Sequence, residues 1–258
     1  MVKRLAALAL LVTIVSGAFI LGINRNTDVV ILNARGIPLD DGNTRFIVTF
    51  EIENNGPAKT LTGLRSASAE RAHVMNPGYD GAPLVIPANS SGIFAMDGAH
   101  VMIMGTDESI SEGASFPLTL EFAESPEVTT RILNAGGDTG MAGMNHNMSN
   151  GIQSEQTPKI TLTATNGPSA EGAEIALDIE NFAFVRAEND TAHVPNHGHA
   201  HIYLNGLKLG RLYDTKFSLG SVPTGTYELV VSLNSNTHQP YMNGETPVRD
   251  TLSFDVTQ

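Results

Sequence analysis

Short stretches in which apolar and polar residues alternate recur along the chain after residue 25, and they constrain the fold more than any other feature. In the segment 44–52, every second residue is large and apolar. These residues are Phe46, Val48, Phe50 and Ile52. A period of two is typical of β-strands with one buried face, and several such strands can pack as two sheets. We therefore expect an all-β protein.

A segment rich in glycine and asparagine, residues 136–157, interrupts this pattern. It has no apolar periodicity, which is typical of a flexible linker. The 258 residues are enough for two modest domains. We expect residues 28–135 and 158–258 to form two β-sandwiches of the cupredoxin or immunoglobulin-like type. In the second, Asn205-Gly206 between two leucines predicts a tight hairpin turn.

The first 23 residues begin with the basic pair Lys3-Arg4 and continue as an apolar run. Such a segment is typical of a secretory signal peptide, and the apolar run is also long enough for a marginal membrane-anchor helix. The basic residues would keep the N-terminus in the cytoplasm. We therefore expect the rest of the chain to be periplasmic, either soluble or anchored to the inner membrane.

The composition argues against two kinds of site. The formal net charge of -12 and the lack of a Lys/Arg cluster make nucleic-acid binding improbable. The chain has no cysteine, which excludes disulfides and thiolate metal sites. Copper binding would then depend on histidine and methionine, which suits an oxidising compartment.

The tripeptide His-Val-Met occurs twice, at residues 73–75 and 100–102, the second copy within an expected strand over 97–105. In a strand, the histidine and methionine share one face and the valine takes the other. Imidazole and thioether together suit Cu(I). If the strands are neighbours, four ligands converge: His73, Met75, His100 and Met102. Alternatively, the methionines are core residues and each histidine is an ordinary polar side chain.

Further segments between about Ile31 and Leu133 carry a family resemblance. They are Ile52-Glu53-Asn54-Asn55-Gly56, Leu61-Thr62-Gly63-Leu64, Ile86-Pro87-Ala88, residues 98–105, and Glu112-Gly113 followed by residues 116–122. Together with His73, they resemble the periplasmic copper chaperones of the PCuAC type. The resemblance implies a small β-sandwich that binds Cu(I) through His73, His100 and Met102 and is not an enzyme.

The resemblance is incomplete at the fourth ligand. In that family, a methionine lies near the far side of a longer hairpin after the first histidine. Here residues 73–84 form a shorter connection without that methionine, and Met75 is the nearest substitute. The family's role implies delivery of copper to a respiratory oxidase. The implied partners are a copper-receiving oxidase subunit or a thiol-bearing assembly factor.

The expected linker is unusual in its methionines and its histidine, which are Met141, Met144, His146 and Met148. Flexible Met/His segments can capture Cu(I) and pass it on by ligand exchange, so we expect a transient linker site. A plain spacer is the alternative, because composition alone does not separate the two.

The second half contains the five remaining histidines, which are His193, His197, His199, His201 and His238. On the strand before Asn205, His199, His201 and Tyr203 share one face. Imidazole is a ligand of both Cu(II) and Zn(II), so we expect a second site for copper or zinc. The alternative is a polar cluster at the surface.

These features favour a copper-binding metallochaperone. The first alternative is a copper or zinc oxidoreductase with a superoxide dismutase-like site at His199, His201 and His238. A hydrolase is not supported, because no Ser-centred elbow or HExxH motif is present. The second alternative is a structural or adhesive β-sandwich protein, which predicts no tight copper binding.

Overall fold

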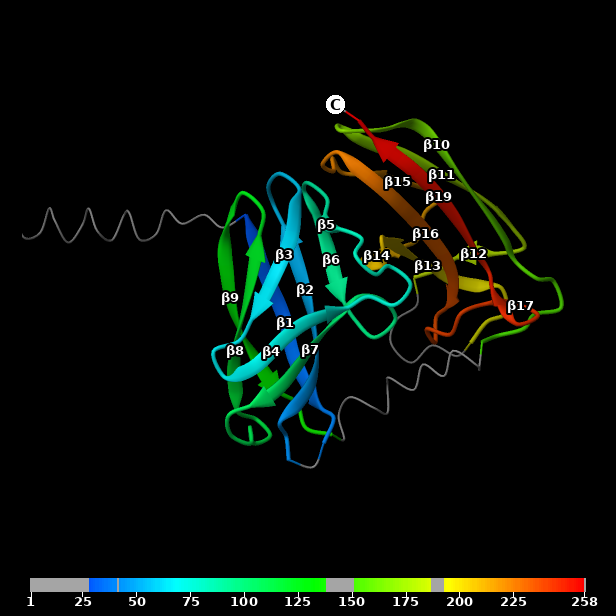
Figure 1. Cartoon of the computed structure of the whole chain (residues 1–258). Helices are drawn as coiled ribbons and strands as arrows, with labels where there is room; N and C mark the ends of the chain where they lie inside the picture. The colour runs from blue at the N-terminus through cyan, green and yellow to red at the C-terminus, as the bar shows by residue number, and fades with distance from the viewer. Residues whose placement is uncertain (1–27, 41, 138–150, 187–192, 258) are drawn as a thin grey trace, which may run out of the picture.

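A computed structural model describes residues 28–40, 42–137, 151–186 and 193–257, and in these ranges the chain forms strands and turns (Figure 1). The expectation of an all-β protein is confirmed. In the described ranges no helix is long and apolar enough to cross a membrane. The expected signal or anchor over residues 1–23 lies outside them, as do Met141, Met144, His146 and Met148 of the linker.

The first half forms a continuous set of paired strands. They are β1 (Val29–Pro38), β2 (Arg45–Asn54), β3 (Lys59–Arg65), β4 (Ala69–Met75), β5 (Leu84–Ile86), β6 (Ser90–Phe94), β7 (His100–Thr106), β8 (Ser115–Phe122) and β9 (Ser125–Asn134). The spatial order is β6-β2-β1-β9-β8-β3-β5, and β7 pairs with both β2 and β4. The first part of β2 pairs with β7 and its last part pairs with β6.

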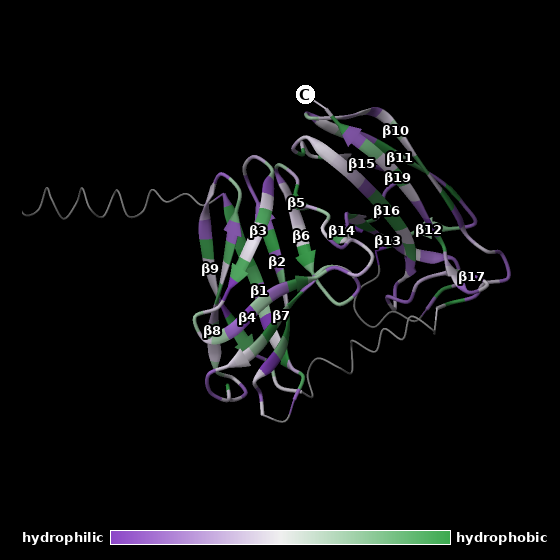
Figure 2. Ribbon diagram, viewed as in Figure 1, coloured by the Kyte–Doolittle hydropathy of each residue, from purple (hydrophilic) through white to green (hydrophobic). Residues whose placement is uncertain are grey.

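The core of the first half confirms the alternation read from the sequence. The alternating residues Phe46, Val48, Phe50 and Ile52 of β2 are buried, and Phe46 contacts Phe116 of β8 with ring centroids 5.0 Å apart. Val101 and Ile103 of β7 belong to the same core. Hydrophobic and hydrophilic residues are accordingly interleaved along the strands in Figure 2. Residues of strands that are not hydrogen-bonded to each other thus meet across one core, as in a β-sandwich.

The second half is built from two packed layers. Its strands are β10 (Lys159–Ser169), β11 (Gly172–Glu180), β12 (Ala183–Phe184), β13 (His197–Leu204), β14 (Leu207–Leu212), β15 (Lys216–Leu219), β16 (Gly225–Ser235), β17 (Met242–Asn243), β18 (Thr246–Pro247) and β19 (Arg249–Val256). One layer has the order β19-β16-β13-β14 and the other the order β10-β11-β15. Leu162 and Leu177 of one layer share a core with Ile202 and Leu229 of the other.

The turn between β13 and β14 is the predicted hairpin. Leu204 pairs with Leu207, and the two residues between them, Asn205 and Gly206, have φ values of 45° and 80°. Two successive residues with positive φ are typical of a type I′ turn, and Asn-Gly adopts it with little strain. This turn places Gly206 beside the first half, because its carbonyl accepts a hydrogen bond of 3.0 Å from the Ala99 amide.

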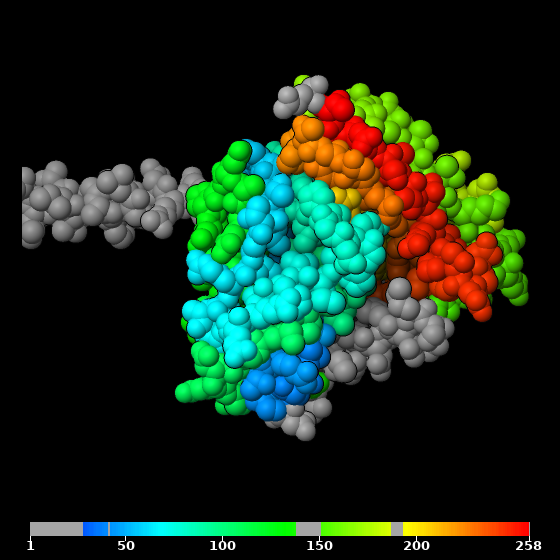
Figure 3. Space-filling model, viewed as in Figure 1, coloured from blue at the N-terminus to red at the C-terminus, as the bar shows by residue number. Residues whose placement is uncertain are grey.

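The two halves pack against each other (Figure 3). Each half also contributes a side chain to the core of the other. β14 pairs with β6 through Lys208 and Ile93, which links the sheets of the two halves. Leu207 belongs to the core of the first half, and Val85 belongs to the core of the second. The division into units at 28–135, 136–157 and 158–258 stays a prediction.

The connection after β4 also contacts the second half. The Asn76 side chain donates a hydrogen bond of 2.8 Å to the Asn205 carbonyl, and the Tyr79 hydroxyl donates one to the Glu228 carboxylate. The end of the expected linker behaves similarly, because Ile152 pairs with Tyr241 and packs against the second core. The connection between β4 and β5, residues 76–83, therefore packs against the second half.

Candidate metal sites

Two pairs of candidate ligands meet on the antiparallel strands β4 and β7. The register places His73 opposite Met102 and Met75 opposite His100. Opposed residues point to the same face with Cβ atoms about 4.5–5.5 Å apart. Neighbours of like parity on one strand lie about 6.5–7 Å apart. The four side chains therefore form one small surface, which we call the β4–β7 patch.

The β4–β7 patch faces away from the core. Val101 and Ile103, which alternate with the ligands of β7, are 0% exposed, whereas Met75 is 42% exposed. The other three side chains of the patch are half-buried. β4 and β7 lie at the front of the first half in Figure 1. The predicted alternation is confirmed for β7, although the strand begins at His100 and residues 97–99 form a turn instead.

Each histidine of the β4–β7 patch has a ring nitrogen that can bind a metal ion. Nδ1 of His73 is buried without a hydrogen-bond partner among the described residues. Burial, Arg71 and His100 lower the pKa of His73, which favours the neutral imidazole. Nδ1 of His100 lies 3.1 Å from the Gly98 carbonyl. If that nitrogen carries the proton, it donates to the carbonyl and leaves Nε2 of His100 as a metal ligand.

Arg71 marks the end of the patch. It lies opposite Met104, in the next pair on the same face after His73 and Met102. The positively charged guanidinium of Arg71 would repel a cation bound close to it. A site for a cation is therefore better placed between the His73–Met102 and Met75–His100 pairs than toward Met104.

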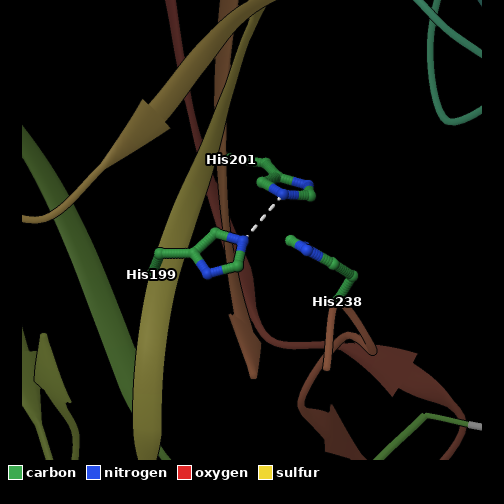
Figure 4. A group of neighbouring side chains, drawn as sticks. All are labelled: His199, His201 and His238. Atoms are coloured by element: carbon green, nitrogen blue, oxygen red, sulfur yellow. Dashed lines mark hydrogen bonds between the residues drawn. The ribbon is translucent and has the colours of Figure 1, made fainter. Parts of the chain in front are cut away.

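A second group of histidines lies in the second half (Figure 4). His199 and His201 extend from β13, and His238 points toward them from the turn after β16. Nε2 of His199 lies 3.0 Å from Nε2 of His201, and one ring nitrogen from each of the three residues lies within 4.8 Å of the others. His199 and His201 are only 1% and 3% exposed. We call this group the three-histidine cluster.

Burial favours the neutral imidazole of His199 and His201 in the cluster. It lowers the pKa of His199 to about 3, with help from the neighbouring His201 and His238. Burial also lowers the pKa of His201, although Asp97 opposes this effect. The neutral imidazole is the form that binds metal ions.

A carboxylate from the first half contacts the cluster. Oδ2 of Asp97 lies 3.4 Å from Nδ1 of His201, and it accepts hydrogen bonds from Tyr203 at 3.1 Å and Lys208 at 2.6 Å. Burial alone would raise the pKa of Asp97, but the bonds from His201 and Lys208 outweigh burial and hold the pKa well below its usual range. Asp97 is therefore ionised.

The cluster opens into a cavity of about 410 Å³ between the two halves. Residues of both halves line it, including Tyr79 and Asp97 from the first and His201, Tyr203 and His238 from the second. The cluster is thus buried within the fold but reachable from this cavity.

The structure does not bring the other candidate histidines into the cluster. Among the described residues, the group within 4.8 Å contains His199, His201 and His238. Nδ1 of His197 lies 2.7 Å from the Pro195 carbonyl, and His193 is exposed with its ring near Tyr241. Asp97 and Lys208 were not predicted, because no local pattern links either residue to a histidine far away in the sequence.

Comparison with protein families finds a match for the first half. Residues 29–134, less than half of the chain, match the model of the LpqE-like family, described as "Putative lipoprotein LpqE-like". The match covers nearly the same segment as the resemblance read from the sequence. This match confirms the resemblance of the segment to PCuAC-type proteins. The comparison with curated proteins finds no match.

Solved structures similar to the chain include PCuAC domains. The copper-bound PCuAC domain from PmoF2 is 20% identical, with a TM-score of 0.37, and the alignment covers 42% of this chain and 93% of that domain. The apo PCuAC domain from PmoF1 is 18% identical, with a TM-score of 0.37, and the alignment covers 42% of this chain and 92% of that domain. The CupB2 chaperone of Pseudomonas aeruginosa is 6% identical, with a TM-score of 0.25, 88% of this chain and 100% of that chain covered.

Proposed function

We propose that this protein carries Cu(I) at the β4–β7 patch and passes it to an acceptor without catalysing a reaction. The observation that carries this proposal is the register of β4 and β7. That register places two imidazoles and two thioethers on one accessible face: His73, Met75, His100 and Met102.

The donor set suits a carrier of Cu(I). Thioether sulfur is a soft ligand, which favours Cu(I) over Zn²⁺ or Ca²⁺. Methionine also needs no deprotonation before it binds a metal, so only the imidazoles link binding to pH. The exposed Met75 offers an acceptor a route for ligand exchange at the edge of the patch.

The LpqE-like match and the N-terminal sequence support an exported protein at the cell envelope. The copper acceptor in this proposal is an oxidase subunit or a thiol-bearing assembly factor. Thiolate binds Cu(I) more strongly than thioether does, which gives transfer a direction. Met141, Met144, His146 and Met148 would assist by holding the ion transiently.

A Cu(I) titration of the full chain under anaerobic, reducing conditions tests the patch, with a coloured Cu(I) chelator as competitor. The double variant His100→Gln, Met102→Leu removes one ligand from each opposed pair. We expect its affinity at this site to fall about 100-fold or more, as if each ligand contributes about 1.4 kcal/mol.

Met104→Leu is the matched control, since Met104 lies on the same face of β7 but opposite Arg71. It should bind Cu(I) as the parent does. Unchanged affinity and stoichiometry in the double variant would rule out the patch as the Cu(I) site.

A further inference from the structure

The three-histidine cluster has the geometry of a second metal site that is independent of the β4–β7 patch. Two nitrogens bound to one ion at about 2.0–2.1 Å lie about 2.8–3.4 Å apart for angles between square-planar and tetrahedral. The Nε2 atoms of His199 and His201 are 3.0 Å apart and thus already have this spacing. His238 completes the set after a shift of roughly 1–2 Å, a distance that rotation of a side chain provides.

The other nitrogen of His201 supports the same conclusion. Histidines that bind metals usually donate their second ring N–H to a carboxylate or carbonyl, which fixes the ring and makes the ligand more basic. Nδ1 of His201 lies 3.4 Å from Oδ2 of Asp97, so Nε2 of His201 is directed at His199. Lys208 and Tyr203 donate hydrogen bonds to this carboxylate, and each also lies 3.2 Å from Nδ1 of His201.

The charges around the cluster permit a cation. Lys208 and Arg211 carry the positive charges nearest to the cluster, and Nζ of Lys208 lies 3.2 Å from Nδ1 and 3.4 Å from Nε2 of His201. The same Nζ lies 2.6 Å from Oδ2 of the ionised Asp97, whose negative charge offsets that of Lys208. The three imidazoles of the cluster differ from the mixed imidazole and thioether donors of the β4–β7 patch. Such a set favours a divalent ion of intermediate softness, with Cu(II) ahead of Zn(II) in affinity.

We propose that His199, His201 and His238 bind one divalent transition-metal ion, Cu(II) more tightly than Zn(II), and that Asp97 of the first half orients His201 for this purpose. The ion is reached through the cavity between the halves and keeps an open coordination position there. The ligands come from one half and the orienting carboxylate from the other, so the site is complete only when the halves are packed together.

The test uses the full chain with His73→Gln and His100→Gln as the parent, so that the β4–β7 patch does not contribute. The probes are Cu²⁺ alone and Zn²⁺ alone, without reductant. We expect one ion per chain, and a Cu(II) electron paramagnetic resonance spectrum with coupling to imidazole nitrogens. His238→Gln should weaken binding about 100-fold or more. This change lies in a half-buried turn and should leave the fold intact.

His197→Gln is the matched control, because this histidine precedes the cluster on β13 and is bonded to Pro195 instead. It should bind both ions as the parent does. Asp97→Asn should weaken binding about 10- to 100-fold while the nitrogen coupling is retained, the behaviour of an orienting group. Melting curves with and without Zn²⁺ show that each variant is folded.

Several results would overturn the proposal. They are the absence of a tightly bound ion in the parent, equal affinities of His238→Gln and the parent, or loss of binding in His197→Gln. Failure of the Cu(I) titration at the β4–β7 patch would leave this proposal standing, because these variants already lack that patch.

Discussion

One short turn between β6 and β7 supports both candidate sites. The Gly98 carbonyl lies beside Nδ1 of His100, and the preceding Asp97 contacts His201. The turn is held by the Gly98 amide, which donates to the Ala95 carbonyl at 3.0 Å. At the scale of single residues, this turn fixes a ring nitrogen in each half of the molecule.

Gly98→Ala tests how closely the turn approaches the second half. A Cβ at this position would lie 2.7 Å from the Gly206 carbonyl oxygen, so part of the backbone must shift. We expect a loss of about 1–3 kcal/mol in the free energy of unfolding, measured by urea denaturation. Gly137→Ala is the control, because a Cβ there meets no atom within 4 Å. Equal stabilities of both variants and the parent would contradict the packing described.

At the scale of elements, successive side chains of β7 point alternately to the core, where they stabilise the fold, and to the face that carries the candidate ligands. His100 and Met102 belong to the patch, whereas Val101 and Ile103 enter the core. A shift of one residue in the pairing with β4 would exchange the two faces. The buried Val101 and Ile103 therefore fix the register that brings the ligands together.

Ile103→Ala and Met104→Ala test this separation at neighbouring positions. Ile103 is 0% exposed, and its truncation should cost about 2–5 kcal/mol through lost contacts and a cavity. Met104 faces the surface, so its truncation should cost less than about 1 kcal/mol. Denaturant unfolding of the two variants measures both values. A larger cost for Met104→Ala would mean that the faces of β7 are assigned wrongly.

The sequence predicted these local features because they depend on periods of two and on turn chemistry. Apolar residues from Phe46 to Ile52 occupy every second position of one strand, and Asn205-Gly206 can adopt the two positive φ values of its turn. The pairing of Asp97 with Lys208 was not predictable in this way. It depends on the packing of distant segments, which leaves no periodic signal along the chain.

At the scale of the whole molecule, the two halves are joined by contacts beyond the chain connection. β14 pairs with β6, and the connection after β4 contacts β16 through Tyr79 and Glu228. Burial, followed by the bond to Glu228, raises the pKa of Tyr79 to about 12. Packing of the halves should therefore depend on pH in the alkaline range.

The folded state favours the neutral phenol of Tyr79, so the free energy of unfolding should fall as the phenol ionises. The ordinary pKa of tyrosine is about 10, so the stabilisation by Tyr79 is fully present below pH 10 and is lost as the pH rises toward 12. Tyr79→Phe should lack this loss and show a flatter dependence of stability on pH between these values. Unfolding curves at several pH values measure it, and identical slopes for parent and variant would contradict the contact.

The central claim is that thioethers and imidazoles of neighbouring strands surround one Cu(I). The most direct measurement is copper X-ray absorption of the full chain loaded with one equivalent of Cu(I), with His199→Gln and His238→Gln removing the three-histidine cluster. We predict both sulfur and nitrogen scatterers, and a weaker sulfur signal after Met102→Leu. A spectrum with nitrogen and oxygen alone, unchanged by Met102→Leu, would contradict the claim.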